Sequence, residues 1–404
     1  MKKEKLEELR AELDTFLGEF EGCFKTEASR AHLGTYVRGQ LGPLERKSIE
    51  PMALEAGVAP RTLQEFVGFH RWSESAMRSR VRSLVVRDHA DPDAVGVFDD
   101  TSFAKKGKKT VGIKRQHCGA TGKIDNCVQT VHLSYVTPGF SATVDSDVYL
   151  PEDWANDPVR RKEAGVPESV VFRKKWEIAL DLLARTLAED VRPRWITSDE
   201  NYGRVTEFIQ AIERRALLYV VEIPVVTWGW TARGFERGRP FRRIDALFPR
   251  GGSPWIDYRV KETTKGPIVW RARAVRFRLH ADPSQERWLV FAKNPLTKEK
   301  KYFLSNAPAD TPIESLLAVA FTRWHVERNF EDLKMEIGLD HFEVRKYLSL
   351  QRHLALSMVS LLFLTRAARS LGGKKGEDPL DARTGADALR HADRATALAT
   401  SSPG

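Results

Sequence analysis

Apolar residues recur at intervals of three and four positions along residues 1–90, without the strict alternation of a strand. This spacing predicts amphipathic helices. Within them, residues 49–66 (IEPMALEAGVAPRTLQEF) have the spacing of a helix-turn-helix, with a glycine in the turn and a proline opening the second helix. Arg61 and Gln64 would point outward from that second helix, where base edges or phosphates of DNA could lie. A plain helical hairpin fits the same pattern.

From residue 94 the pattern changes to short apolar or alternating runs separated by turn residues, which predict strands. The expected strands cover 94–103, 110–119, 126–136, 192–199 and 216–225, and helical patterns occupy 158–189 and 204–215 between them. Strands and helices in this order predict an α/β fold for residues 91–225, with a mixed sheet flanked by helices.

Residues 226–306 are rich in tryptophan, arginine, glycine and proline and contain alternating segments such as PIVWRARAVRFRLH, so we expect a β-rich insertion. Residues 307–371 return to a helical pattern. Their apolar run 354–365 is too short to span a bilayer and predicts a buried helix. Residues 372–404 are rich in glycine, alanine, aspartate and serine, a composition that predicts disorder.

Composition narrows the class of protein. The 404-residue chain carries a formal net charge of +10, which favours a polyanionic partner, nucleic acid first. Three cysteines are too few for a disulfide framework, so we expect reduced thiols. The N-terminal segment lacks the apolar core of a signal peptide. We therefore expect a soluble cytoplasmic protein that does not enter a membrane.

Carboxylates follow two of the predicted strands. Asp99 and Asp100 end one apolar run, and Asp199 ends another. Each aspartate alone fits a strand end or a helix cap. In α/β sheets, however, ligand sites lie at the carboxyl ends of strands, and carboxylates gathered there are the hard oxygen ligands that Mg²⁺ prefers. Two such ions can polarise the attacking and leaving oxygens of a phosphoryl displacement.

A third carboxylate stands in the charged stretch RWHVERNFEDLK, residues 323–334. On a helix, Arg323, Glu327 and Lys334 share one stripe. This arrangement fits an ordinary ladder of ion pairs, each contributing about 0.3–0.5 kcal/mol. It also fits a site in which Glu327 completes the metal ligands while the two cations hold phosphates. Composition does not separate these alternatives.

The spacing R-x3-E-x6-K in this stretch resembles the Y-R-E-K signature of cut-and-paste insertion-sequence transposases with an RNase H-like DDE domain. FDDTS resembles the strand that carries the first aspartate of that family, and ITSDENYG resembles the strand that carries the second. The resemblance covers roughly residues 95–345. It implies an RNase H-like sheet with a β-rich insertion, preceded by a helical DNA-binding domain.

Carried over by position, the resemblance makes Asp100, Asp199 and Glu327 the metal-binding and catalytic triad. Asp99 is the alternative first ligand. Strand alternation puts Asp99 and Asp100 on opposite faces of the sheet, so only one of the two is expected to face the site. Asp100 is preferred, since the family's aspartate tends to be followed by threonine, as it is here. One departure is Ala320, which stands where the signature has tyrosine.

The resemblance implies a transposase that cleaves DNA at transposon ends and transfers the strand into target DNA. It also implies Mg²⁺ as the ion, with Mn²⁺ as an alternative, duplex DNA carrying terminal inverted repeats and target DNA as partners, and a homodimer in the synaptic complex of a bacterial, nucleoid-associated enzyme. We expect Arg323, Lys334, Lys105 and Lys106 to contact DNA phosphates, as the basic run KKGKK suggests.

Two alternatives remain. A transposase-derived DNA-binding protein without catalytic activity would keep the fold, and the alanine at the signature tyrosine leaves room for it. A two-carboxylate glycoside hydrolase fits the acids and tryptophans, but it does not predict the basic charge or the helix-turn-helix spacing.

Overall fold

The computed structural model describes residues 3–247, 253–261 and 266–370, so the tail predicted to be disordered lies outside the described residues. The chain forms two compact units. Unit 1 takes the described residues of Met1–Ala90, Asp100–Val191 and Glu327–Gly404, and unit 2 takes Asp91–Asp99 and Arg192–Val326. The predicted domain boundaries are not tested by this division and stay predictions.

The N-terminal part of unit 1 is helical, as predicted. It contains α1 (Lys3–Gly18), η1 (Glu21–Cys23), α2 (Glu27–Leu41), α3 (Ile49–Glu55), α4 (Pro60–Gly68) and α5 (Glu74–His89). Between α3 and α4, Gly57 adopts a positive φ of 66°, a conformation that glycine takes at little cost. Met52, Leu63 and Phe66 are fully buried, so the apolar face of the predicted helix-turn-helix segment packs inward. Contact of this segment with DNA stays a prediction.

The rest of unit 1 combines strands with helices. Its elements are the second half of β1 (Val95–Ala104), β2 (Lys114–Cys118), β3 (Lys123–Thr137), β4 (Phe140–Tyr149), α6 (Glu152–Ala155), α7 (Pro158–Ala164), α8 (Lys175–Ala188), the end of α12 (Ile313–Ile337) and α13 (Tyr347–Ser370). β3 pairs antiparallel with β2 and β4, and the tight turn into β4 contains Gly139 with a φ of 79°. Helices α5, α8 and α13 pack against β4.

Each of two predicted helical regions contains two or more helices. The helical pattern 158–189 forms α7 and α8, and Gly165 takes a left-handed conformation that caps the end of α7. The region 307–371 likewise divides into α12 and α13, with Gly338 at a φ of 65° directly after α12. Glycine at both positions removes the penalty that a side chain would add, so each helix stops there.

Helix α13 is a core helix. Among the described residues it alone is long and apolar enough to cross a membrane, and 94% of its most apolar stretch is buried inside the protein. Polar residues along it bond to α2: Tyr36 Oη lies 2.8 Å from His353 Nδ1, and Gln40 Nε2 donates to Ser357 Oγ at 2.9 Å. The prediction of a buried helix at 354–365 is confirmed.

Unit 2 is built on parallel strands. The first half of β1 pairs in parallel with β5 (Trp195–Ser198), and β5 pairs in parallel with β6 (Leu218–Glu222). Two short helices follow β5 along the chain, α9 (Glu200–Gly203) and α10 (Thr206–Glu213). Helix α9 packs against β5 and β6. This parallel arrangement brings the carboxyl ends of β1, β5 and β6 to one edge.

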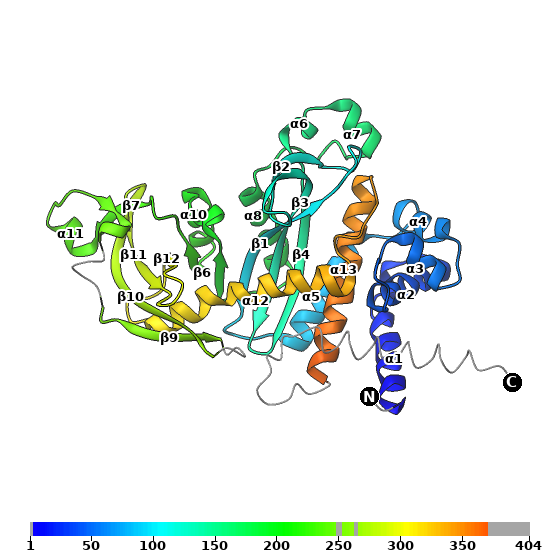
Figure 1. The fold of residues 1–404 in the computed structure, drawn as a ribbon, viewed down its shortest axis with the longest axis horizontal. Coiled ribbons are helices and arrows are strands. Elements are labelled where there is room, and N and C mark those ends of the chain that lie inside the picture. Colours follow the sequence, from blue (N-terminus) through cyan, green and yellow to red (C-terminus); the bar gives the residue numbers. More distant parts are fainter. Residues whose placement is uncertain (1–2, 248–252, 262–265, 371–404) are drawn as a thin grey trace. The chain divides into compact units, whose positions relative to one another are not determined.

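The predicted β-rich segment extends this sheet in the antiparallel direction. From β6 the strand order continues as β12, β11, β10, β7 and β8, and β9 also pairs with β10. Figure 1 labels all of these strands except β8. The bounds are β7 (Trp228–Thr231), α11 (Ala232–Glu236), β8 (Arg242–Arg243), η2 (Ile244–Ala246), β9 (Ile256–Lys261), β10 (Ile268–Leu279), β11 (Asp282–Lys293) and β12 (Lys300–Ser305). The predicted mixed sheet flanked by helices, with a β-rich segment, is therefore confirmed.

Candidate active site

The candidate site begins where two parallel strands end. β1 and β5 pair from Val95 with Trp195 to Val97 with Thr197. The two strands are parallel, so both leave the paired region in the same direction. β1 continues without a break through Asp99 and Asp100, and Asp199 directly follows β5. Three carboxylates therefore lie at the carboxyl ends of parallel strands, where catalytic and ligand-binding groups are found in α/β sheets.

Asp99, Asp100 and Asp199 each offer a carboxylate oxygen, and these oxygens all lie within 4.8 Å of one another. All three residues are half-buried. Two negative charges at that separation repel by roughly 1 kcal/mol in bulk water and about 3 kcal/mol at an effective dielectric of 20. A divalent cation would relieve this repulsion, and a set of hard oxygen donors suits Mg²⁺ or Mn²⁺. The residues present therefore fit such an ion.

Asp199 is held in place by the helix that it begins. Its Oδ1 accepts hydrogen bonds from the backbone N–H groups of Asn201 (3.0 Å) and Tyr202 (3.4 Å), and its Oδ2 accepts one from the side-chain amide of Asn201 (2.9 Å). Asp199 is therefore the N-cap of α9. Capping and metal binding do not compete, because an ionised carboxylate has about four acceptor positions.

Asp100 has a cationic partner that the sequence did not indicate. Lys175, the first residue of α8, forms an ion pair with Asp100 Oδ2, and its ammonium also lies 5.8 Å from the centre of the Tyr149 ring. The side chain of Lys175 is 30% exposed. Seventy-five residues separate the two partners, and no local pattern marks a lysine at a helix start as part of a distant site.

Glu222 is a further carboxylate that sequence reasoning missed. It ends β6, the strand beside β5, and its side chain is only 15% exposed. Lys301 Nζ lies 2.9 Å from Glu222 Oε1, and Arg323 Nη2 lies 3.8 Å from Glu222 Oε2. The signal was present in the sequence, because Glu222 closes the apolar run LYVV as Asp99 closes VGVF.

Comparison with known proteins identifies the family. Residues 19–278 match the family described as DDE superfamily endonuclease. The chain belongs to this DDE endonuclease family. The RNase H-like fold class predicted from the sequence is thereby confirmed, together with the resemblance to DDE transposases of insertion sequences. The family match does not favour the glycoside hydrolase alternative.

One curated relative of this DDE-family chain is a probable transposase for insertion sequence element IS701 from Microchaete diplosiphon. It is 27% identical over 314 residues, which cover 76% of this chain and 75% of the relative. Among solved structures, the NurA nuclease from Sulfolobus solfataricus aligns over 70% of this chain and 85% of its own, with 9% identity. The TM-score of that alignment is 0.25, so the likeness carries no weight for fold or function.

In this DDE-family chain, Asp100 and Asp199 of the predicted triad lie close together, and Asp99 lies with them. We expected strand alternation to separate Asp99 from Asp100, yet both offer an oxygen close to Asp199. Consecutive Cα atoms are about 3.8 Å apart, so two carboxylates can reach one region even when their Cβ atoms diverge. The choice of Asp100 over Asp99 therefore stays a prediction.

The third predicted ligand, Glu327, lies on α12, whose backbone is described. Its side chain lies outside the described residues, as do the side chains of residues 324–333. The family match ends at residue 278, before this position. The role of Glu327 therefore stays a prediction. Of its predicted cationic neighbours, Arg323 approaches Glu222, and the ammonium of Lys334 lies 5.8 Å from the Phe103 ring centre.

The predicted DNA-contacting residues differ in how they are engaged. Lys105 donates hydrogen bonds to the carbonyls of Asp340 (2.8 Å) and Phe342 (2.6 Å), and burial lowers its pKa to about 8. Lys106 is exposed. On α4, Arg61 forms an ion pair with Glu65 at 2.8 Å, and Gln64 is exposed. None of these observations tests DNA contact, which stays a prediction for all four residues.

Two lysines later in the same basic run contribute to a basic cavity of about 310 Å³ in unit 1. It is lined by the cations Lys108, Lys109, Arg160, Arg345 and Lys346, together with Trp154, Glu163 and Ala164. Arg160 is already paired with Asp157 at 2.8 Å, and its guanidinium lies 4.8 Å from the Trp154 ring centre. Five cations around one small cavity favour an anion such as a phosphate.

Proposed function

We propose that this protein is a DNA transposase that cleaves phosphodiester bonds at transposon ends and transfers the freed strand into target DNA. The observation that carries the proposal is the cluster of Asp99, Asp100 and Asp199 at the carboxyl ends of β1 and β5, in a chain of the DDE endonuclease family. The similarity to a probable IS701 transposase supports transposition over other endonuclease activities.

In this proposal Asp100, Asp199 and Glu327 hold divalent cations, Mg²⁺ in the cell and Mn²⁺ as a substitute. When bound, such an ion acts as a Lewis acid on phosphate oxygens and lowers the pKa of a water nucleophile. Asp99 is the alternative first ligand, because it also offers an oxygen close to Asp199. For the aspartates, this proposal is supported by their oxygen ligands and by the half-buried clustering of Asp99, Asp100 and Asp199.

The neighbouring residues then position the substrate. The cap hydrogen bonds fix the carboxylate of Asp199, so the ligand is oriented before DNA arrives. Lys175 pairs with Asp100 and is partly exposed, so it can also donate to a phosphate oxygen. Glu222 restrains Lys301 and Arg323, which on this account orients the Arg323 guanidinium toward the backbone of the scissile strand.

DNA contacts beyond the acidic cluster are assigned to basic surfaces. We assign duplex recognition to α3 and α4, with Arg61 and Gln64 outward on α4. Lys106 and the cations of the basic cavity, Lys108 and Lys109 among them, would contact phosphates and give salt-dependent affinity. Lys105 would act chiefly by fixing its loop, since both its hydrogen bonds go to carbonyls of the protein. Two transposon ends imply a homodimer acting on the bacterial nucleoid.

The test is a strand-transfer assay. The full chain is incubated with labelled duplex carrying the ends of the insertion element that encodes it, a supercoiled target plasmid, and Mg²⁺ or Mn²⁺. We expect cleavage that exposes a 3′-hydroxyl, followed by joining to the plasmid. Asp199→Asn and Glu327→Gln should abolish both steps, and comparison of Asp99→Asn with Asp100→Asn assigns the first ligand.

Each outcome is decisive for a different part of the proposal. Cleavage without joining would make the protein an endonuclease only. Specific DNA binding without cleavage in either metal would favour the alternative, an inactive transposase-derived DNA-binding protein. Full activity of Asp199→Asn would overturn the proposed site.

A further inference from the structure

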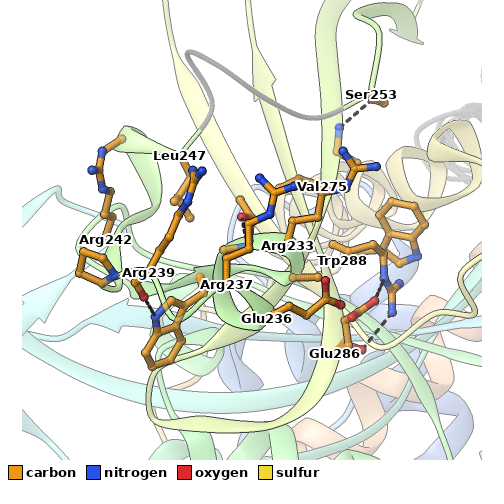
Figure 2. A pocket seen from close by; sticks show the side chains of 18 residues that line it. Arg233, Glu236, Arg237, Arg239, Arg242, Leu247, Ser253, Val275, Glu286 and Trp288 are labelled. Carbon is orange, nitrogen blue, oxygen red and sulfur yellow. Dashed lines mark hydrogen bonds and ion pairs between the residues drawn. The ribbon is translucent and has the colours of Figure 1, made fainter.

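The β-rich part of unit 2 contains a cavity of about 850 Å³ that the acidic cluster does not share (Figure 2). Five arginines line it: Arg233, Arg237, Arg239, Arg242 and Arg276. They come from α11, from the loop that follows it, from β8 and from β10. Figure 2 shows Arg242 toward one end of the cavity and Trp288 toward the other, with Arg233 and Arg237 between them.

The cavity is strongly cationic. Its lining holds two carboxylates against five guanidinium groups, a net excess of three positive charges. One of the carboxylates, Glu286, is already paired with Arg276 at 2.8 Å. The side chains of Arg233, Arg237, Arg239 and Arg242 are exposed and form no hydrogen bond or ion pair within the described part of the chain.

The fifth arginine of the cavity is built into the wall. The guanidinium of Arg276 lies 4.8 Å from the Trp288 ring centre, and Glu286 accepts a hydrogen bond from its Nε. Its Nη1 is buried and has no hydrogen-bond partner in the described structure. The Arg276 side chain as a whole is 25% exposed, so it adds positive charge to the wall of the cavity.

Exposed aromatic rings lie beside the arginines. Trp228, Phe235 and Phe241 are 48%, 40% and 42% exposed. The rings of Phe235 and Phe241 contact Trp230, with ring centres 5.3 Å and 5.6 Å from that of Trp230. The ring centre of Trp228 lies 5.9 Å from that of Phe241. A second cavity of about 320 Å³, lined by Trp228, Phe241 and Arg242 among others, shares Arg242 with the first.

The unpaired arginines and the exposed aromatic rings together favour one class of ligand. Clustered, exposed aromatic side chains mark an interaction site, and unpaired arginines bind phosphates in a bidentate manner. A cationic groove with aromatic rings is the combination that binds single-stranded nucleic acid, where each base offers a face for stacking. Bases in a duplex are already stacked on one another, so a duplex would use the arginines but leave the rings unused.

We propose that this surface, defined by Arg233, Arg237, Arg239, Arg242, Trp228, Phe235 and Phe241 and named here the strand-holding surface, binds unpaired DNA. Phosphates lie against the arginines of the cavity, and bases stack on the exposed rings. The inference rests on the proposed function in so far as strand cleavage at a DNA end frees such a strand. Binding itself requires no metal.

The test measures affinity of the full chain in EDTA, so that metal-dependent chemistry does not enter. The probes are a fluorescein-labelled 20-nucleotide single strand and its duplex, titrated at several salt concentrations. The triple variant Arg233→Ala/Arg237→Ala/Arg239→Ala should lower the salt slope for the single strand by about 2, since each lost phosphate contact contributes roughly 0.7. Phe241→Leu and Trp228→Leu should each weaken single-strand binding about 5- to 150-fold while changing duplex binding little.

Matched controls exclude a general effect on folding or charge. Arg214→Ala removes an exposed arginine of unit 2 outside the cavity, and Leu296→Ala removes a side chain that is 86% exposed. Both controls should bind like the unmodified protein. Circular dichroism and thermal unfolding check that each variant is folded.

The outcomes separate this inference from the proposed function. Single-strand binding that depends on the arginines and rings, in a protein that cleaves nothing, would uphold the surface and refute the transposase. Unchanged single-strand affinity and salt slope in the folded variants would overturn the surface, even if cleavage is intact. Equal losses for single strand and duplex in the ring variants would also overturn it, because stacking on unpaired bases would then have no part.

Discussion

Gly203 offers a direct test of how the acidic site is held, because it ends the short helix that Asp199 caps. A Cβ at Gly203 would lie 2.0 Å from the carbonyl oxygen of Glu222 and 3.0 Å from its carbonyl carbon. Ordinary contact begins at 3.4 Å, so α9 and β6 would have to separate by about 1.4 Å. The obstacle is backbone, which cannot rotate away as a flexible side chain can.

Gly203→Ala should therefore destabilise the protein by about 3 kcal/mol, at the upper end of the range for inserting one methyl group into a packed site. Since α9 carries Asp199 at its start and rests on the strand that ends with Glu222, the shift also displaces site residues. Displacements of about 1 Å cost up to about 100-fold in rate. We expect DNA cleavage to fall by 10- to 100-fold.

The assay is urea unfolding followed by tryptophan fluorescence, paired with the cleavage rate under conditions where the variant is folded. The control is Gly18→Ala, because a Cβ there meets nothing within 4 Å, so stability should stay the same or rise by about 0.5 kcal/mol. If Gly203→Ala unfolds and cleaves like the unmodified protein, then close packing of α9 on β6 does not hold the site.

Three further predictions follow from charged and titratable groups. Lys175→Met should tighten Mn²⁺ binding roughly 10-fold in calorimetry, through loss of a nearby positive charge, yet slow DNA cleavage; weaker Mn²⁺ binding would contradict the assigned pairing with Asp100. Burial lowers the pKa of His353 to about 4, so the unfolded chain takes up its proton first, and below pH 6.5 stability should fall by about 1.4 kcal/mol per pH unit from this residue. The slope of stability against pH, measured by urea unfolding between pH 6.5 and 4.5, should be smaller by this amount in His353→Gln, because the other buried histidines still contribute. Arg287→Met should cost about 3–5 kcal/mol in unfolding free energy, because it leaves the carboxylates of Glu213 and Asp282 without their shared partner; adding Glu213→Gln should restore part of the loss, and no restoration would argue against this pairing.

The sequence predicted elements well where a local rule decides them. The helices of residues 1–90, the buried helix at 354–365 and the β-rich segment follow from periodicity, and the aspartates at the ends of β1 and β5 follow from apolar runs that stop at a carboxylate. The helical patterns did not indicate where glycine ends one helix and another begins. Gly165 ends α7 within the helical region 158–189, and Gly338 directly follows α12.

The partners of the site residues could not be predicted, because they depend on tertiary contacts. Lys175 reaches Asp100 from a helix 75 residues later in the chain. Lys105 belongs to a basic run that reads as phosphate-binding, yet its ammonium is bound by two carbonyls of the loop after α12. Glu222 ends its strand by the same pattern as Asp99, so the sequence alone indicates this carboxylate.

The most direct test of the acidic site is the rate of DNA cleavage in Mg²⁺ by Asp199→Asn, compared with Glu200→Gln. Glu200 follows Asp199 and is the first residue of α9; it is about half exposed and pairs with Arg204 at 3.2 Å. Glu200→Gln therefore matches Asp199→Asn in position and in the charge that is removed. We expect Asp199→Asn to lose more than about 100-fold in rate, equivalent to several kcal/mol of transition-state stabilisation, and Glu200→Gln to stay within about twofold of the unmodified protein. Equal rates for the two variants would contradict the assignment of Asp199 as a metal ligand.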